Sequence, residues 1–198
     1  MSPLEVWEAI MEQFQVNARA VLKFTKKVPG VRQLPIDSQI MMVQQAMYPI
    51  VLLTYSLDYD LVTGDYNYFS LSHDEEAYIQ SYFTPFKMLV QTFHILGNIV
   101  QRLKVDDIES AFLCGLCLLS QSNDTDDYQE ALVAALTVYC ERKALVGKDR
   151  VGLLLLRLCE MLRCNQIHLK AIINIQMNSS EYYNVQMPQL FQETFLNT

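Results

Sequence analysis

Apolar residues recur at intervals of three and four along most of the chain, which is the spacing of one face of an α-helix. The first such stretch predicts a helix over residues 3–27, which Pro29 and Gly30 end. The second is apolar on almost every side and predicts a helix over residues 37–59, with Asp37 as a candidate N-terminal cap. Further helices are expected over residues 74–82, 85–103, 107–121, 128–146, 149–175 and 187–195. The pattern therefore predicts an all-α fold.

Polar segments separate these helices. Residues 60–72 are rich in Tyr, Gly, Asn and Ser and predict a loop with a short hairpin at Gly64 and Asp65. Asp106 and Asp107 form an acidic first turn, residues 122–127 a capping loop, Gly147 a helix break, and residues 177–185 a polar tether. No repeat of fixed period is present in the sequence, which argues against a helical solenoid.

Composition adds a large apolar core to this picture. The chain has 198 residues, of which 51% are hydrophobic and 19% charged, so it suits one domain with an ample core. Met, Tyr and Phe are plentiful at 9, 11 and 9 residues. A lipophilic cavity would explain so much apolar and aromatic surface.

The charge excludes some partners. A net charge of −7 opposes binding to a phosphate backbone, which needs clustered Lys and Arg, so we expect no direct nucleic-acid binding. The N-terminus has acidic residues and no apolar signal-peptide core. Residues 40–57 are the nearest approach to a membrane span, but Gln44, Gln45, Thr54 and Ser56 interrupt them. We interpret them as the buried centre of a domain.

The five cysteines predict reduced thiols rather than disulfides. Their number is odd and four lie in apolar helical runs, which is typical of a nuclear or cytosolic protein. Cys114 and Cys117 have the spacing of half a zinc site, but no second pair with suitable spacing exists in the sequence. Core packing is the favoured interpretation of this pair, and no metal is expected.

Catalysis has little support in the sequence. His73, His94 and His168 lie far apart, without a nucleophile elbow, a phosphate-binding loop or a carboxylate pair. We therefore expect no enzyme. His168 and Cys164, one helical turn apart, could ligate haem iron, but such a pair on an apolar helix is usually structural.

Two motifs at opposite ends of the chain carry a family resemblance. The first comprises Phe24, Lys26, Lys27, Val28, Pro29, Gly30, Leu34, Gln39 and Ile40. It resembles the signature region of nuclear receptor ligand-binding domains, although Val31 replaces an aromatic and Ser38 an aspartate. The second comprises Leu190, Phe191, Glu193 and Phe195 and resembles that family's C-terminal activation helix, with Thr194 in place of a second hydrophobic residue.

The resemblance implies a fold and a set of boundaries. It implies a three-layer antiparallel helical sandwich that begins at about the family's third helix, lacks the first helices and contains a short β-turn segment. Residues 1–198 then form one ligand-binding domain with no DNA-binding domain. Trp7 and the helix order look closest to the thyroid-hormone-receptor-like group, which includes ecdysone, liver X and orphan receptors.

The implied function is that of a ligand-regulated transcription factor module in the nucleus, with a share in the cytoplasm. Lys26 and Glu193 match the residues that cap the two ends of a Leu-x-x-Leu-Leu coregulator helix, and Gln44 and Leu190 belong to the same groove. Gln44 stands where many members have a second lysine, and Pro49 where heterodimerising members have a glutamate. Lys26 taken alone is equally well an ordinary solvated charge.

The residues that match ligand-contacting positions of the family form the expected site for a small lipophilic molecule. They are Ile10, Gln13, Phe14, Asn17, Val51, Leu52, Thr54, Tyr55, Phe93, His94 and His168. Thr54 replaces an arginine, which makes a ligand carboxylate less favoured. The alternative is an interior filled by Met41, Met42, Met47 and aromatic residues, in a fragment that dimerises or sequesters coregulators without sensing a ligand.

The last expectation is a dimer interface on the helix over residues 149–175. Its candidate residues are Leu153, Leu156, Arg157, Met161 and Arg163, on a helix that is too apolar to be solvated on all sides. By resemblance, the partner is a second copy of the chain or a retinoid X receptor.

Overall fold

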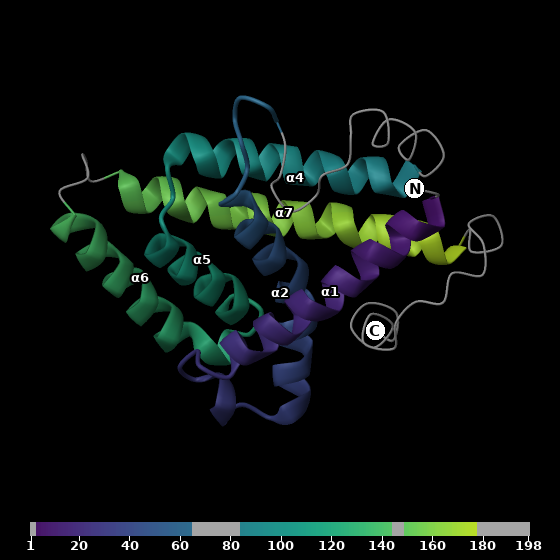
Figure 1. The fold of residues 1–198 in the computed structure, drawn as a ribbon. Coiled ribbons are helices and arrows are strands. Elements are labelled where there is room, and N and C mark those ends of the chain that lie inside the picture. Colours follow the sequence, from purple (N-terminus) through teal and green to yellow (C-terminus); the bar gives the residue numbers. More distant parts are fainter. Residues whose placement is uncertain (1–2, 65–83, 144–148, 178–198) are drawn as a thin grey trace.

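Helices dominate the part of this chain that the structure describes. The computed structural model describes residues 3–64, 84–143 and 149–177 (Figure 1). The α-helices of this part are α1 (Pro3–Thr25), α2 (Ile36–Ser56), α4 (Thr84–Leu103), α5 (Asp107–Leu119), α6 (Asp126–Arg142) and α7 (Arg150–Met177), with 3-10 turns η1 (Val31–Gln33) and η2 (Asn123–Thr125). No strand occurs within the described ranges, so the predicted all-α class is confirmed.

Helix α2 lies at the centre and packs against α1, α4, α5 and α7 (Figure 1). Its side chains Met42, Met47, Leu52 and Leu53 are fully buried, which explains why its sequence is apolar on almost every side. In the part of the chain that the structure describes, no helix combines the length and apolarity that crossing a membrane requires. Most of residues 42–57 are buried or half-buried, as the sequence predicts, whereas Ile40 and Met41 are exposed.

The turn after α1 fits one residue type. Gly30 has a φ of 85°, a left-handed conformation that favours glycine. A Cβ at this position would also lie 2.4 Å from the ring of Tyr128 at the start of α6. The Tyr128 hydroxyl donates to Gln33 at 2.9 Å, so the turn between α1 and α2 is attached to α6.

Two helix starts differ from the sequence expectation. Pro35, not Asp37, is the N-cap of α2. No side-chain hydrogen bond caps this end, and Asp37 lies in the first helical turn. The prediction for Asp37 was wrong because Pro35 itself suits the extended entry to a helix. Asp106 is the N-cap of α5 rather than part of its first turn. Its carboxylate accepts from the N–H groups of Ile108 and Glu109, while the Glu109 carboxylate accepts from the Asp106 N–H, which is a complete capping box.

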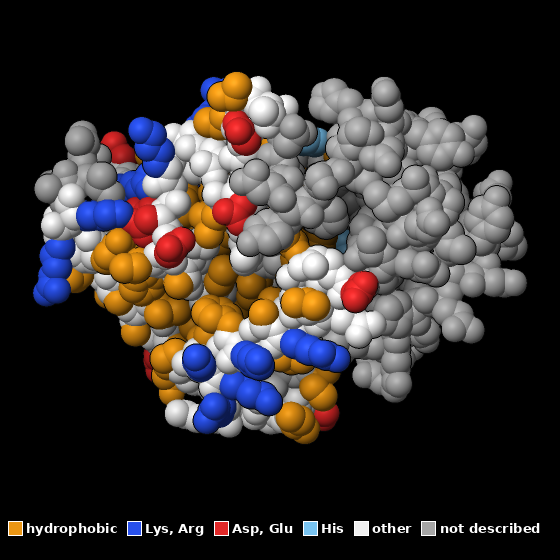
Figure 2. Space-filling view, viewed as in Figure 1, with side chains coloured by type: hydrophobic (Ala, Val, Ile, Leu, Met, Phe, Trp, Pro, Cys, Tyr) orange, Lys and Arg blue, Asp and Glu red, His pale blue; other side chains and the backbone are white. Residues whose placement is uncertain are grey.

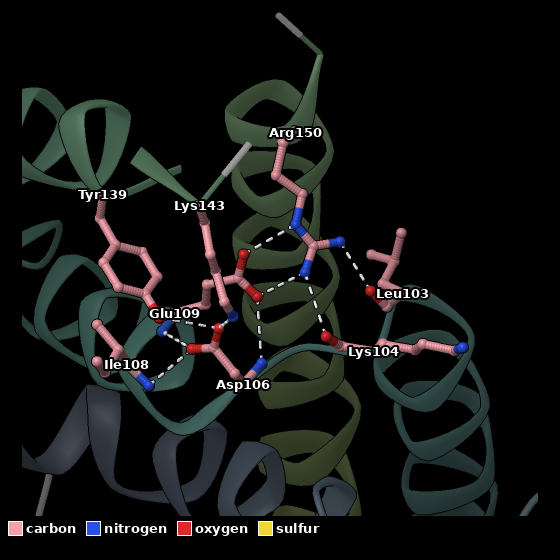
Figure 3. A network of polar contacts seen from close by, with 8 residues as sticks. All are labelled: Leu103, Lys104, Asp106, Ile108, Glu109, Tyr139, Lys143 and Arg150. Carbon is pink, nitrogen blue, oxygen red and sulfur yellow. Dashed lines mark hydrogen bonds and ion pairs between the residues drawn. The ribbon is translucent and has the colours of Figure 1, made fainter. Parts of the chain in front are cut away.

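A buried ion pair joins this capping box to α7 (Figure 3). Arg150 binds Glu109 with two hydrogen bonds, Nε to Oε1 at 2.8 Å and Nη2 to Oε2 at 2.5 Å. It also donates to the carbonyl oxygens of Leu103 at 2.7 Å and Lys104 at 3.3 Å, at the end of α4. The Glu109 side chain has no exposed surface, and that of Arg150 is only 12% exposed. One guanidinium thus connects α4, α5 and α7.

Helix α6 joins the same network through Asp106. The second carboxylate oxygen of Asp106 accepts from Tyr139 at 3.1 Å and from Lys143. Burial acts to raise the pKa of Asp106, but hydrogen bonds from Lys143, the Glu109 N–H and Tyr139 outweigh it and hold the pKa below its usual value. The N-terminus of α5 is therefore where four helices are fixed to one another.

Several sequence predictions lie outside the described residues. They are the helix over residues 74–82, the hairpin beyond Gly64, the break at Gly147, the tether beyond Met177 and the activation helix with Leu190, Phe191, Glu193 and Phe195. The side chains of Ile10 and Phe14 also lie outside the described part.

Replacing Arg150 by methionine should destabilise the fold by about 3–5 kcal/mol, because Glu109 would remain buried without its partner. Urea denaturation measures this loss. The control is Arg163→Met, which removes an ion pair to Glu160 whose two side chains are 51% and 32% exposed. That substitution should cost no more than about 1 kcal/mol. Equal losses in the two variants would contradict a special role for the buried pair.

Candidate functional site

An aromatic cluster lies where α1, α2, α4 and α7 meet, and its members are Asn17, Tyr48, Tyr55, Phe93 and His168. The rings of Tyr48 and His168 stack, with centroids 3.7 Å apart and planes 7° apart. Phe93 joins the two tyrosines, with its centroid 6.3 Å from that of Tyr48 and 6.1 Å from that of Tyr55. Asn17 donates to the Tyr55 hydroxyl at 2.5 Å. Side chains from four helices thus converge on one point.

Helical spacing explains how α2 contributes twice to this cluster. Tyr48 and Tyr55 are seven residues, or two turns, apart and so lie on the same side of the helix, and half-buried Val51 between them packs against Tyr55. The Tyr48 hydroxyl shares a 2.6 Å hydrogen bond with the buried Thr92 of α4. Both ends of the Tyr48 side chain are therefore fixed.

A second aromatic contact adjoins the cluster. Tyr59, just beyond α2, lies edge-on to His94 of α4, with ring centroids 5.9 Å apart. The Tyr59 hydroxyl is 3.4 Å from His94 Nδ1. Tyr59 and Tyr55 belong to one small apolar group, so this contact continues the cluster along α2 and α4.

Two of the cluster's polar groups are uncharged at neutral pH. Burial lowers the pKa of His168 to about 3 and raises the pKa of Tyr48, so the imidazole and the phenol are both neutral. Hydroxyl, amide and imidazole groups in apolar surroundings can orient a lipophilic molecule through hydrogen bonds. The same neutrality leaves His168 unable to serve as a charged acid near pH 7.

The structure brings most of the predicted ligand residues together. Asn17, Tyr55, Phe93 and His168 belong to the cluster, Val51 packs against Tyr55, and His94 contacts Tyr59 beside the cluster. Gln13 is half-buried on α1. Leu52 is fully buried within the main core.

Thr54 differs from the other described residues of the predicted ligand site in its exposure. Its side chain is exposed, and its hydroxyl donates to the carbonyl of Ile50 in its own helix at 2.9 Å. The hydroxyl is thus used within α2.

Sequence reasoning missed Tyr48, Tyr59 and Thr92. The seven-residue interval between Tyr48 and Tyr55 was the one local signal available for Tyr48. Thr92 becomes visible only when α2 and α4 are packed together, since it lies 44 residues away from Tyr48.

The residues predicted to bind coregulators lie on neighbouring helices where they are described. Lys26 is exposed just after α1, and Gln44 is half-buried on α2. Figure 2 shows Lys and Arg side chains gathered over this end of α1, beside hydrophobic surface. Exposed basic residues here include Arg19, Lys23 and Lys27. On α2, Ile40 and Met41 are 49% and 42% exposed.

The predicted dimer residues divide into surface and core. Leu153 and Leu156 are 40% and 54% exposed on α7, and Arg163 is exposed beside Glu160. Arg157 is half-buried and donates to the carbonyl of Leu153. Met161 is fully buried, so its assignment to the interface was wrong. An apolar residue on such a helix can lie either in the core or on the surface, and the spacing of apolar residues in the sequence does not distinguish these two positions.

The cysteines fit the predicted reduced state. All five are free; Cys114, Cys117, Cys140 and Cys164 are buried and Cys159 is exposed. Burial raises the pKa of Cys114 to about 12 and that of Cys164 to about 11, which keeps both thiols protonated and poor metal ligands. Among the described residues, no group of three or more His, Cys, Asp or Glu side chains could hold a metal ion.

Comparison with protein families decides the identity of this fold. The family model described as "Ligand-binding domain of nuclear hormone receptor" matches residues 6–185, which include every described helix from α2 to α7 and most of α1. The chain belongs to the nuclear receptor ligand-binding domain family. This family is not enzymatic, in agreement with the sequence expectation.

Similar curated proteins are retinoic acid receptors. The chain is 25% identical to retinoic acid receptor alpha-B of Danio rerio over 206 aligned positions, which cover 98% of this chain and 43% of that receptor. It is 24% identical to retinoic acid receptor alpha of Takifugu rubripes, over 98% of this chain and 44% of that receptor. The chain thus spans less than half the length of these relatives. The similarity agrees with the predicted thyroid-hormone-receptor-like group.

Acid should destabilise this ligand-binding domain through His168. The unfolded chain takes up a proton at His168 below about pH 6.5, whereas the folded chain does so only near pH 3. This contribution to stability is present above pH 6.5 and is lost as the pH falls from 6.5 towards 3. Between pH 7.5 and 5.5 the wild type should lose about 1.4 kcal/mol more than His168→Phe. Urea denaturation at both pH values measures the difference, and an identical pH dependence in the two proteins would contradict it.

Proposed function

We propose that this chain binds a small lipophilic ligand and recruits coregulators in response, as a ligand-regulated transcription factor module. The aromatic cluster carries this proposal. It places neutral hydroxyl, amide and imidazole groups of Asn17, Tyr55 and His168 among buried apolar side chains, in a family of ligand-binding domains. The fold assigned with it is the family's three-layer antiparallel sandwich, from about the third helix to the activation helix.

A neutral lipophile suits the cluster better than an acid. The His168 imidazole and the Tyr48 phenol are uncharged, and burial would penalise a ligand carboxylate without a cation beside it. Hydroxyl or ketone groups can instead exchange hydrogen bonds with the Tyr55 hydroxyl or the Asn17 amide. This distinguishes the proposed ligand from the acid in the names of the similar receptors.

The second candidate is a ligand-independent module with a filled interior that dimerises or sequesters coregulators. One observation favours it. Asn17 bonds Tyr55 and Tyr48 bonds Thr92, so these two pairs already satisfy each other's hydrogen bonds, and the Tyr48 ring is packed against His168. A ligand would have to displace some of these contacts or fit beside them.

Coregulator binding is proposed at the surface formed by Lys26, Gln44, Leu190 and Glu193. A cation near the C-terminus of a bound Leu-x-x-Leu-Leu helix and a carboxylate near its N-terminus would stabilise its unpaired backbone groups. Exposed Ile40 and Met41 supply apolar contact from α2. The chain would act in the nucleus, with a share in the cytoplasm, and would leave DNA contact to other parts or partners because of its net charge of −7.

A thermal-shift screen of neutral and acidic lipophiles, with native mass spectrometry of the purified chain, tests the ligand proposal. A neutral lipophile should raise the unfolding temperature and the affinity for a Leu-x-x-Leu-Leu peptide. Asn17→Trp should abolish the thermal shift by filling the site, and the matched control Val16→Trp should keep it, because Val16 is 56% exposed.

Lys26→Ala should weaken peptide binding roughly tenfold, since a charge-assisted cap contributes about 1.5–3 kcal/mol; the control is Lys23→Ala.

Two results would overturn these assignments. If no lipophile copurifies or shifts the unfolding temperature while the peptide still binds, the ligand-independent module takes the place of the sensor. If Lys26→Ala and Glu193→Lys both leave peptide affinity unchanged, the proposed coregulator surface is wrong.

Dimerisation is proposed through α7, with a second copy or a retinoid X receptor-like partner. Leu153 and Leu156 are the apolar residues of this surface, and Arg157 and Arg163 flank them. Replacing Leu156 by arginine should convert dimer to monomer in sedimentation experiments. Val138→Arg is the control, because Val138 is 45% exposed on α6 instead. A wild-type chain that stays monomeric at high concentration, alone and with such a receptor, would exclude the interface.

A further inference from the structure

Helix α2 contains a carbonyl that its own backbone cannot satisfy. Pro49 lies inside the helix, which continues from Ile36 to Ser56. Proline has no N–H, so the carbonyl of Gln45, four residues earlier, lacks the hydrogen bond that a helix normally supplies. Inside a helix, a proline ring also crowds the carbonyl four residues earlier. A donor from outside the helix can therefore bind this carbonyl.

Asn165 of α7 supplies the donor. Its Nδ2 lies 2.9 Å from the Gln45 carbonyl oxygen, and the residue is only 5% exposed. A carbonyl accepts and does not donate, so the amide nitrogen must face Gln45, and this fixes the orientation of the side chain. The Oδ1 atom of Asn165 is buried and has no hydrogen-bond partner within the described residues. The bond to Gln45 is thus the contact that accounts for an amide at this position.

This bond lies one helical turn from the Tyr48–His168 stack. Gln45 and Tyr48 are three residues apart on α2, and Asn165 and His168 are three residues apart on α7. The hydrogen bond at 2.9 Å and the ring stack at 3.7 Å therefore join the same two helices at neighbouring turns. Two contacts at neighbouring turns resist sliding and rotation of α7 against α2, which either contact alone would permit.

We propose that Asn165 is a positioning residue for the ligand site. Through the carbonyl that Pro49 leaves free, it holds α7 in the register that stacks His168 on Tyr48. Thr92 fixes the other end of Tyr48 from α4. The description of the stack as part of a ligand site rests on the proposed function, whereas its dependence on Asn165 can be tested without any ligand.

The test is the NMR signal of the His168 ring in Asn165→Leu, a variant of similar branched shape and larger volume that lacks the donor. A proton held over the face of an aromatic ring resonates upfield, and the chain has three histidines, so His168→Gln assigns the signal. We expect the upfield shift to be lost in Asn165→Leu. The matched control Gln166→Leu, an exposed amide next to it on α7, should keep the shift.

A second variant, Pro49→Ala, distinguishes two roles of Asn165: positioning α7, or only donating a hydrogen bond to the Gln45 carbonyl. Pro49→Ala restores an N–H for Gln45 and should retain the stack, because a carbonyl can accept two hydrogen bonds. In Pro49→Ala/Asn165→Leu, the unfolding temperature should be higher than in Asn165→Leu. The upfield shift of the His168 ring should still be absent. This background also keeps the test valid if Asn165→Leu alone fails to fold.

Two outcomes would overturn the proposal. If the upfield shift survives in both variants without Asn165, other contacts set the stack. If it is lost in Asn165→Leu but returns in the double variant, the unpaired carbonyl had disturbed α2, and Asn165 only satisfies it. Neither outcome bears on ligand binding, and a negative lipophile screen would leave this positioning role intact.

Discussion

The buried carboxylate of Glu109 constrains the rest of this molecule. A carboxylate without exposed surface is costly unless a cation and further donors meet it, and here Arg150 and the Asp106 backbone do so. The same guanidinium holds the end of α4, and Asp106 holds α6 through Tyr139 and Lys143. The first residue of α7 is thereby fixed. Because α7 is 28 residues long, its direction at Arg150 determines where its surface leucines and His168 lie.

The middle of α7 is held by a different kind of contact. Near Arg150 the helix is fixed by charge, whereas near His168 it is fixed by a neutral amide and a ring stack against α2. Such contacts are short-ranged and depend on exact shape, so they specify register more than they add stability. Charged groups thus anchor the first turn of α7, and neutral groups align its middle against α2.

The helices could be predicted from sequence far better than the contacts between them. Periodicity placed α1 within two residues of its observed end at Thr25, because Pro29 and Gly30 leave a local signal. Asn17, Phe93 and His168 were found because family positions and one helix face coincide. Thr92 and Asn165 were missed, since their partners lie 44 and 120 residues away and pairing over such distances leaves no local pattern. Met161 was misplaced because apolar spacing on a helix does not tell core from interface.

The contact between Gly30 and Tyr128 limits the evolutionary paths open to this domain. A side chain at position 30 would meet both an unfavourable backbone angle and the Tyr128 ring. Shrinking the residue at 128 would remove the clash but also the hydroxyl that binds Gln33, and the backbone strain would remain. A substitution at position 128 therefore does not make a larger residue at position 30 free of strain. Substitutions in the turn after α1 and at the start of α6 should therefore have coupled effects on stability, although about a hundred residues separate the two sites.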